Sequence, residues 1–298
     1  MKQMNAARRQ AHWDLRAAGN FIGGGTGCGL VLACALAVLL GAPLPRLALA
    51  LGAVCIAAGL TLVWLEIGKP WRALHVFFHP QTSWMTREGI LAGPLLAACA
   101  LAWWFGQPLW LAGAAPLAAG FLYSQARILR AARAIPAWSN PSLVPLIIAT
   151  GLAEGLGAYV ALSALAALAT SAGDTAGAAS LPLVLAALAA GVAREGLRGR
   201  YRRALHTARA PQPTLAWFDR TEVRVLQALR MVSTGLLALG LAVPDGWALA
   251  ALALGGLLAV AGGWGFKVVL ITRAAYTRGA AITHTPTRGR SQARSVVV

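Results

Sequence analysis

Apolar residues are grouped along the chain in eight long blocks, separated by shorter polar segments. They make up 58% of the sequence, and charged residues make up only 12%. A helix that crosses a bilayer needs roughly 20 consecutive, mostly apolar residues. The pattern therefore predicts an all-α polytopic membrane protein, a bundle of eight transmembrane helices. The predicted spans are 20–40, 47–66, 89–106, 108–126, 142–169, 179–195, 228–244 and 247–270.

The predicted membrane domain occupies residues 20–272, between an N-terminal tail (1–19) and a basic C-terminal tail (273–298). The formal net charge is +17. Every Lys and Arg except Arg46 lies in one of the two tails or near the second, fourth or sixth loop. Lys267 is counted with the C-terminal tail. Positive loops face the cytoplasm, so both termini are predicted to be cytoplasmic. Because the charge is confined to alternate loops, it indicates contact with lipid head groups or a protein partner, not nucleic acid.

Two groups of residues favour a structural interpretation. The segment GNFIGGGTGCG (19–29) matches no nucleotide-binding loop, and small residues are typical of closely packed membrane helices. The four cysteines lie inside predicted spans without metal-binding spacing, which predicts buried thiols and no iron–sulfur cluster in this chain. They are Cys28, Cys34, Cys55 and Cys99.

Polar groups within the spans are few. Glu154 is the only acid well inside a span, with Tyr159 one turn beyond it. Ionisable residues in membrane spans are usually functional or paired, so Glu154 is either a proton or quinone contact or one half of an ion pair. No span contains a histidine, which predicts that this chain holds no transmembrane haem.

The loop EIGKPWRALHVFFHPQTSWMTREG (66–89) concentrates titratable and aromatic residues between two apolar spans. Thr82 or Ser83 is expected to cap the next helix. A carboxylate at Glu88, near cations and rings, could exchange protons with a stacked quinone. The alternative is an interfacial aromatic belt with snorkelling cations. The candidate site residues are Glu66, Lys69, Arg72, His75, His79, Trp84, Arg87 and Glu88.

This loop also resembles the membrane anchor subunits of dimethyl sulfoxide reductase-type enzymes, which carry G-x-P-x-R-A followed by S-W-[LM]-[ST]-R-E. The matching residues are Gly68, Pro70, Arg72, Ala73, Ser83, Trp84, Met85, Thr86, Arg87 and Glu88. The resemblance implies an anchor that exchanges electrons between a ferredoxin-like iron–sulfur subunit and quinone. A molybdopterin subunit would perform the substrate chemistry, with molybdenum or tungsten. Glu88 takes the place of the family's quinone-site acid, and Glu66 replaces a histidine found in some members.

The resemblance, joined with the charge pattern, implies a bacterial cytoplasmic membrane and catalytic subunits on its cytoplasmic side. That arrangement is similar to phenylacetyl-CoA:acceptor oxidoreductases and sulfite dehydrogenases, with electrons passing from substrate to ubiquinone or menaquinone in anaerobic respiration. Trp71 and the basic sixth loop (194–224) are candidate partner contacts. Two alternatives stay open: an anchor of the polysulfide reductase type, and a secondary transporter with inverted repeats.

Overall fold

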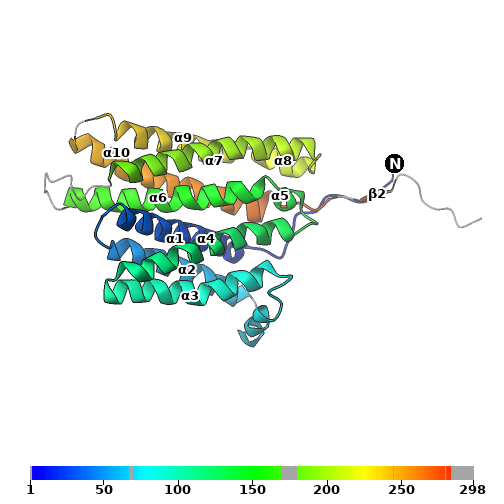
Figure 1. Cartoon of the computed structure of the whole chain (residues 1–298). Coiled ribbons are helices and arrows are strands. Elements are labelled where there is room, and N and C mark those ends of the chain that lie inside the picture. Colours follow the sequence, from blue (N-terminus) through cyan, green and yellow to red (C-terminus); the bar gives the residue numbers. More distant parts are fainter. Residues whose placement is uncertain (1, 67–69, 170–179, 244, 279, 283–298) are drawn as a thin grey trace, which may run out of the picture.

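The computed structural model describes residues 2–66, 70–169, 180–243, 245–278 and 280–282. In this part of the chain, eight helices of at least 19 residues lie alongside one another in an elongated bundle (Figure 1). The long helices are α1 (Leu15–Leu39), α2 (Arg46–Glu66), α3 (Trp84–Phe105), α4 (Pro108–Ala131), α6 (Leu143–Ala169), α7 (Leu181–Thr207), α9 (Thr221–Leu239) and α10 (Asp245–Val268). The short ones are the 3₁₀-helix η1 (Pro70–Phe78), α5 (Pro136–Ser139), α8 (Gln212–Phe218) and the π-helix η3 (Val269–Arg273).

Each predicted span falls on one of the long helices, so the helical class is confirmed. Among the described residues, five helical segments are long and apolar enough to cross a membrane: α1, α2, α3, α6 and α10 with its extension η3. The chain is thus a multi-pass membrane protein by the length and composition of these helices. Eight crossings and their orientation stay predictions, since α4, α7 and α9 are not among these five.

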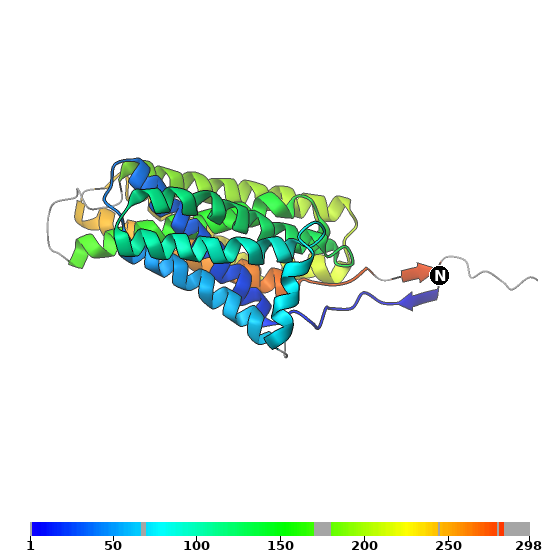
Figure 2. The ribbon, with the colours of Figure 1, turned by 60° about the horizontal axis from the view of Figure 1, so that its bottom comes forward.

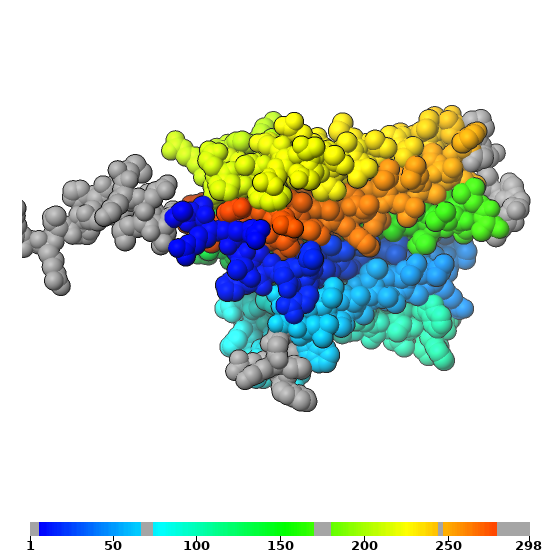
Figure 3. Space-filling view, turned by 180° about the vertical axis from the view of Figure 1, so that it is seen from behind, coloured from blue at the N-terminus to red at the C-terminus, as the bar shows by residue number. Residues whose placement is uncertain are grey.

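One end of the bundle gathers both described ends of the chain. Strand β1 (Lys2–Asn5) pairs antiparallel with β2 (Ala280–Ile282), and this ribbon projects beyond the end that also holds η1, α5 and α8 (Figures 1 and 2). The ribbon departs from the all-α prediction. The two segments that lead to it lie side by side, blue and orange-red in Figure 3. The N–H of Gln10 donates to the carbonyl oxygen of Ala275 at 2.9 Å. The basic loops lie at this same end.

Helix α1 is the centre of the bundle and packs against α2, α4, α6 and α10. Glycines allow this close packing. A Cβ atom added at Gly23 would lie 2.3 Å from the carbonyl oxygen of Cys55, and one added at Gly155 would lie 1.9 Å from the carbonyl carbon of Gly29. The predicted role of the glycine-rich segment in helix packing is therefore confirmed.

One helix boundary that matters for the site agrees with the prediction, and one cation was misplaced. Helix α3 begins at Trp84, where the Ser83 hydroxyl accepts a hydrogen bond from the Thr86 N–H at 3.2 Å. The predicted cap at Ser83 is therefore confirmed, and Glu88 lies in the first turns of α3. At the other end of the chain, Lys267 was assigned to the C-terminal tail, and this was wrong: it lies fully buried in α10.

The predicted sixth loop (194–224) also begins too early in the sequence. Helix α7 runs to Thr207, so Arg194 is a buried helical residue and not the first residue of a loop. Counting charges assigns a Lys or Arg to the nearest polar segment, but a cation with a buried partner can lie inside a bundle. The Pro-containing break and the following helical stretch around Trp217 are present, as α8.

Candidate functional site

A cavity of about 350 Å³ lies between α2, η1 and α3. Its lining is apolar except for one carboxyl group, that of Glu88. Several lining side chains, among them Trp64, Phe77 and Met85, are 40–50% exposed at the outer surface of the bundle. The cavity therefore opens toward the surface that apolar α2 and α3 present to lipid. It is lined by Leu60, Val63, Trp64, Leu74, Val76, Phe77, Met85, Glu88, Gly89, Ala92 and Gly93.

Glu88 is itself only 5% exposed and reaches polar groups on the inner side of α3. The Asn20 side-chain amide donates to its Oε1 at 3.3 Å. The Gln125 amide donates to the backbone oxygen of Asn20 at 3.0 Å and so brings a third helix to the group. In the described residues, no cation forms an ion pair with Glu88 within 4.0 Å. A buried carboxyl group without a charged partner is well suited to gain and lose protons.

The 3₁₀-helix η1 covers one side of this cavity. The Thr86 hydroxyl donates a short hydrogen bond to the backbone oxygen of Val76, and the Phe77 ring lies beside Gly89. A Cβ atom at Gly89 would come within 3.3 Å of that ring. The loop that the sequence singled out thus contributes to the cavity mainly through apolar side chains.

Arg87 and Trp84 were predicted beside Glu88, and the structure places them elsewhere. The Arg87 guanidinium donates to the backbone oxygens of Pro80 and Gln81, at 2.8 and 2.9 Å, and lies 4.0 Å from the centre of the Trp84 ring. Arg127 of α4 lies 4.4 Å from the same ring. Neither residue lines the cavity. They form a cation–aromatic cluster that joins α3 to α4, which agrees with the interfacial-belt interpretation.

The other predicted members of the loop site are also outside the cavity lining. His75 and His79 are exposed, and the His75 ring contacts Phe78 edge-on. Glu66 is half-buried at the end of α2. The side chain of Arg72, Lys69 and the side chain of Trp71 lie outside the described residues. Of the eight predicted residues, only Glu88 lines the cavity among those whose side chains are described.

Glu154, the other predicted acid, forms a buried ion pair. Its Oε2 lies 2.7 Å from Nζ of Lys267, and both side chains are fully buried. The Thr26 hydroxyl donates to the same oxygen at 2.8 Å, and the Trp264 indole N–H donates to Thr26 at 2.8 Å. Of the two interpretations left open for Glu154, pairing with a facing group is therefore confirmed.

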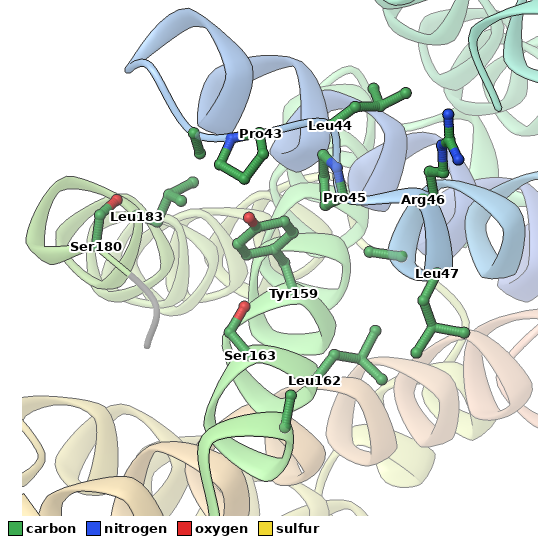
Figure 4. A pocket seen from close by; sticks show the side chains of 13 residues that line it. Pro43, Leu44, Pro45, Arg46, Leu47, Tyr159, Leu162, Ser163, Ser180 and Leu183 are labelled. Atoms are coloured by element: carbon green, nitrogen blue, oxygen red, sulfur yellow. The ribbon is translucent and has the colours of Figure 1, made fainter. Parts of the chain in front are cut away.

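Tyr159, which we grouped with Glu154, lies in a different environment. It lines a second cavity of about 380 Å³ near the end of the bundle opposite the ribbon, beside Pro43 and Pro45 (Figure 4). Its hydroxyl points toward the connection between α1 and α2, and Ser163 lies one helical turn away (Figure 4). The structure therefore does not bring Tyr159 and Glu154 into one site.

Sequence reasoning missed Asn20, Gln125 and Lys267. Each is a polar residue within a predicted span, and that position was the available signal. The spans are consequently richer in polar groups than expected. Among the described residues, no group of three or more His, Cys, Asp or Glu side chains is arranged to hold a metal ion. The four cysteines are free thiols, and Cys28, Cys34 and Cys99 are buried.

These features define a polytopic helical membrane protein with a lipid-facing cavity and a buried carboxyl group. The family model described as "Polysulphide reductase, NrfD" matches residues 3–112, a segment that includes Asn20, Glu88 and the S-W-M-T-R-E motif. The match covers 110 of the 298 residues and agrees with the resemblance drawn from the loop motif. The search of curated proteins found no match. Glu154 and Lys267 lie outside the matched segment.

Proposed function

We propose that this chain is the quinone-reactive membrane anchor of a three-subunit molybdopterin oxidoreductase. The observation that supports this proposal most directly is the lipid-facing apolar cavity, in which Glu88 has the only carboxyl group. A quinone is a lipophilic ring that takes up two protons with two electrons. The cavity offers an apolar volume, aromatic side chains at Trp64 and Phe77, and one group able to exchange protons. These residues fit a quinone ring.

In this proposal Asn20 orients the Glu88 carboxyl group through its amide hydrogen bond. The apolar walls and η1 exclude water from the ring, so that protons reach it through Glu88. Electrons come from the iron–sulfur clusters of a ferredoxin-like partner subunit, and the substrate reacts at a molybdopterin subunit with molybdenum or tungsten. The basic end of the bundle, near η1, is the docking side for these subunits. Following the positive-inside rule, we assign that end to the cytoplasmic side of a bacterial inner membrane.

Filling the cavity tests the quinone site directly. Gly93 lines the cavity, and a Cβ atom added there meets nothing within 4 Å. We expect Gly93→Leu to place its side chain in this space and abolish cross-linking by a photoreactive ubiquinone or menaquinone analogue. Gly113 of α4 is the matched control, because it is equally open and does not line the cavity. Equal labelling of Gly93→Leu and the wild type would refute this site.

The partner subunits are tested by purification from native membranes in mild detergent. We expect the chain to bring down one subunit with iron–sulfur clusters and one with molybdenum or tungsten, measured by elemental analysis. Recovery of the chain alone under conditions that preserve other membrane complexes would contradict the anchor assignment. The same preparation allows a substrate-independent assay, with reduced viologen as electron donor and a quinone analogue as acceptor.

A further inference from the structure

Buried polar side chains continue from Glu88 into the centre of the bundle. Gln125 is fully buried and packs on α1 at Gly24, where an added Cβ atom would lie 2.2 Å from its Nε2. The next glycine of α1, Gly25, makes the same room for Lys267, whose Nζ would lie 2.2 Å from an added Cβ. Two adjacent glycines of α1 thus make room for Gln125, which belongs with Glu88 and Asn20, and for Lys267, which is paired with Glu154.

A second pair of glycines continues the row on the other side of Glu154. A Cβ atom at Gly263 of α10 would lie 2.2 Å from Oε1 of Glu154, and one at Gly262 would lie 2.4 Å from Cγ of Arg230. Arg230 is buried and donates through Nε to Oε1 of Glu195 at 2.7 Å. The row therefore extends from α3 through α1, α6 and α10 to α7 and α9, across the layers of helices in Figure 1.

The far side of this row is partly open. Glu195 also accepts a hydrogen bond from Nε of Arg198 at 2.9 Å, and these two side chains are 20% and 16% exposed. Arg194 lies on the same carboxylate at 3.6 Å and donates to the Ala259 oxygen. Three arginines therefore surround one carboxylate at this end of the row.

All buried side-chain polar atoms that lack a hydrogen-bond partner in the described residues belong to this row. They are Oδ1 of Asn20, Oε1 of Gln125, Oε1 of Glu154, Nε and Nη2 of Arg194, and Nη2 of Arg230. Buried polar groups are satisfied by protein or by ordered water, and polar sites are the ones that hold water. The row thus provides titratable groups at intervals with water-binding atoms between them.

We propose that this row carries protons between Glu88 and the partly exposed Glu195. When Glu88 gives up a proton, the Lys267 ammonium supplies one through Asn20, Gln125 and bridging water, and is left as a neutral amine. A proton that enters at Glu195 and passes Glu154 restores the ammonium, so no charge accumulates. The reverse order removes protons from Glu88. The inference deepens the proposed function, because two protons and two electrons are needed for each quinone reduced.

Hydrogen exchange at Glu88 tests the route without quinone or partner subunits. The infrared C=O band of protonated Glu88 is identified in the purified chain at mildly acidic pH by its loss in Glu88→Gln. The protein is then transferred to heavy water, and the rate at which this band shifts is measured. In this proposal the row leads from the carboxyl group to the partly exposed Glu195, so we expect fast exchange in the wild type.

The main variant is Glu154→Gln/Lys267→Met, which removes both charges together and leaves no unpaired buried ion. We expect exchange at Glu88 to slow by at least about tenfold, in line with the contribution of a positioned acid or base. Asn20→Leu is a second variant of similar volume that removes a partly unsatisfied amide, and it is expected to slow exchange likewise. Thr150→Val is the matched control, since that buried hydroxyl donates only within its own helix, to Leu146.

Exchange at the wild-type rate in both folded variants would overturn the row as the proton route and place proton entry at the cavity mouth. In the viologen assay, the double variant is expected to lower kcat while the KM for the quinone analogue stays within about twofold, with a larger solvent isotope effect. If the wild type fails to bind a quinone analogue, the proposed function fails instead, and the exchange result stands independently.

Discussion

Glu88 and Glu154 are both glutamates buried inside predicted membrane helices, yet their surroundings differ. Within the described residues, Glu88 has only amide side chains as polar partners, Asn20 at 3.3 Å and Gln125, and lines an open cavity. Glu154 has an ammonium group at 2.7 Å and a hydroxyl donor at 2.8 Å, with no cavity beside it among those described. A carboxylate that is firmly paired stabilises the helices around it, whereas a carboxyl group with weak partners beside an open space is available to a ligand. Burial alone therefore does not identify an acid that can meet a ligand.

The largest expected effect on stability comes from breaking the Glu154–Lys267 ion pair. Lys267→Met leaves Glu154 buried without its cation, and we expect a loss of about 3–5 kcal/mol in the free energy of unfolding. Denaturant-induced unfolding in detergent, followed by tryptophan fluorescence, measures this. The double variant Glu154→Gln/Lys267→Met should recover most of the loss. A single variant as stable as the wild type would show that the pair contributes little.

The next largest effect separates function from stability at the open site. Glu88→Gln keeps the shape of the side chain and its acceptor for Asn20, so the free energy of unfolding should change by less than about 1 kcal/mol. Turnover with reduced viologen and a quinone analogue should fall about 100-fold, because an amide cannot exchange the proton. Wild-type turnover would exclude Glu88 as the proton-exchanging group.

Replacing a glycine by alanine near each of the two glutamates, Glu154 and Glu88, tests how much space surrounds it. At Gly263 it would meet Oε1 of Glu154 at 2.2 Å, so Gly263→Ala should destabilise the fold by about 1–3 kcal/mol. At Gly93, beside the Glu88 cavity, nothing lies within 4 Å. Gly93→Ala should therefore be neutral or stabilise by up to about 1 kcal/mol. Thermal unfolding of the two variants side by side checks the difference, and equal losses would contradict it.

The smallest effect is expected for Arg87, although the family motif places it beside Glu88. Arg87→Ala removes two hydrogen bonds to loop carbonyls and one contact with Trp84, all partly exposed. We expect a loss of about 1 kcal/mol in stability and quinone turnover within about twofold of the wild type. A loss of turnover as large as that of Glu88→Gln would bring Arg87 back into the site.

Much of the fold could be predicted because its signals are local. Apolar blocks marked the long helices, and the serine before Trp84 marked the start of α3. The site was predicted less completely. The motif identified Glu88, but Arg87, which precedes it in the sequence, points to another side of α3, since successive residues on a helix do not share a face. The apolar lining from α2 and η1 carried no sequence signal that separates it from lipid-facing residues.

The order of apolar and basic segments by itself determined the helical membrane class, the approximate helices and the basic end of the bundle. It also singled out Glu154, because acids are rare in such helices, while the polar loop and its motif singled out Glu88. Only the tertiary structure decided which acid is paired and which is open. The partners come from distant segments: Lys267 is 113 residues from Glu154, and Asn20 is 68 residues from Glu88. Such contacts depend on how helices pack, and adjacent glycines on α1 and α10 provide the space for them.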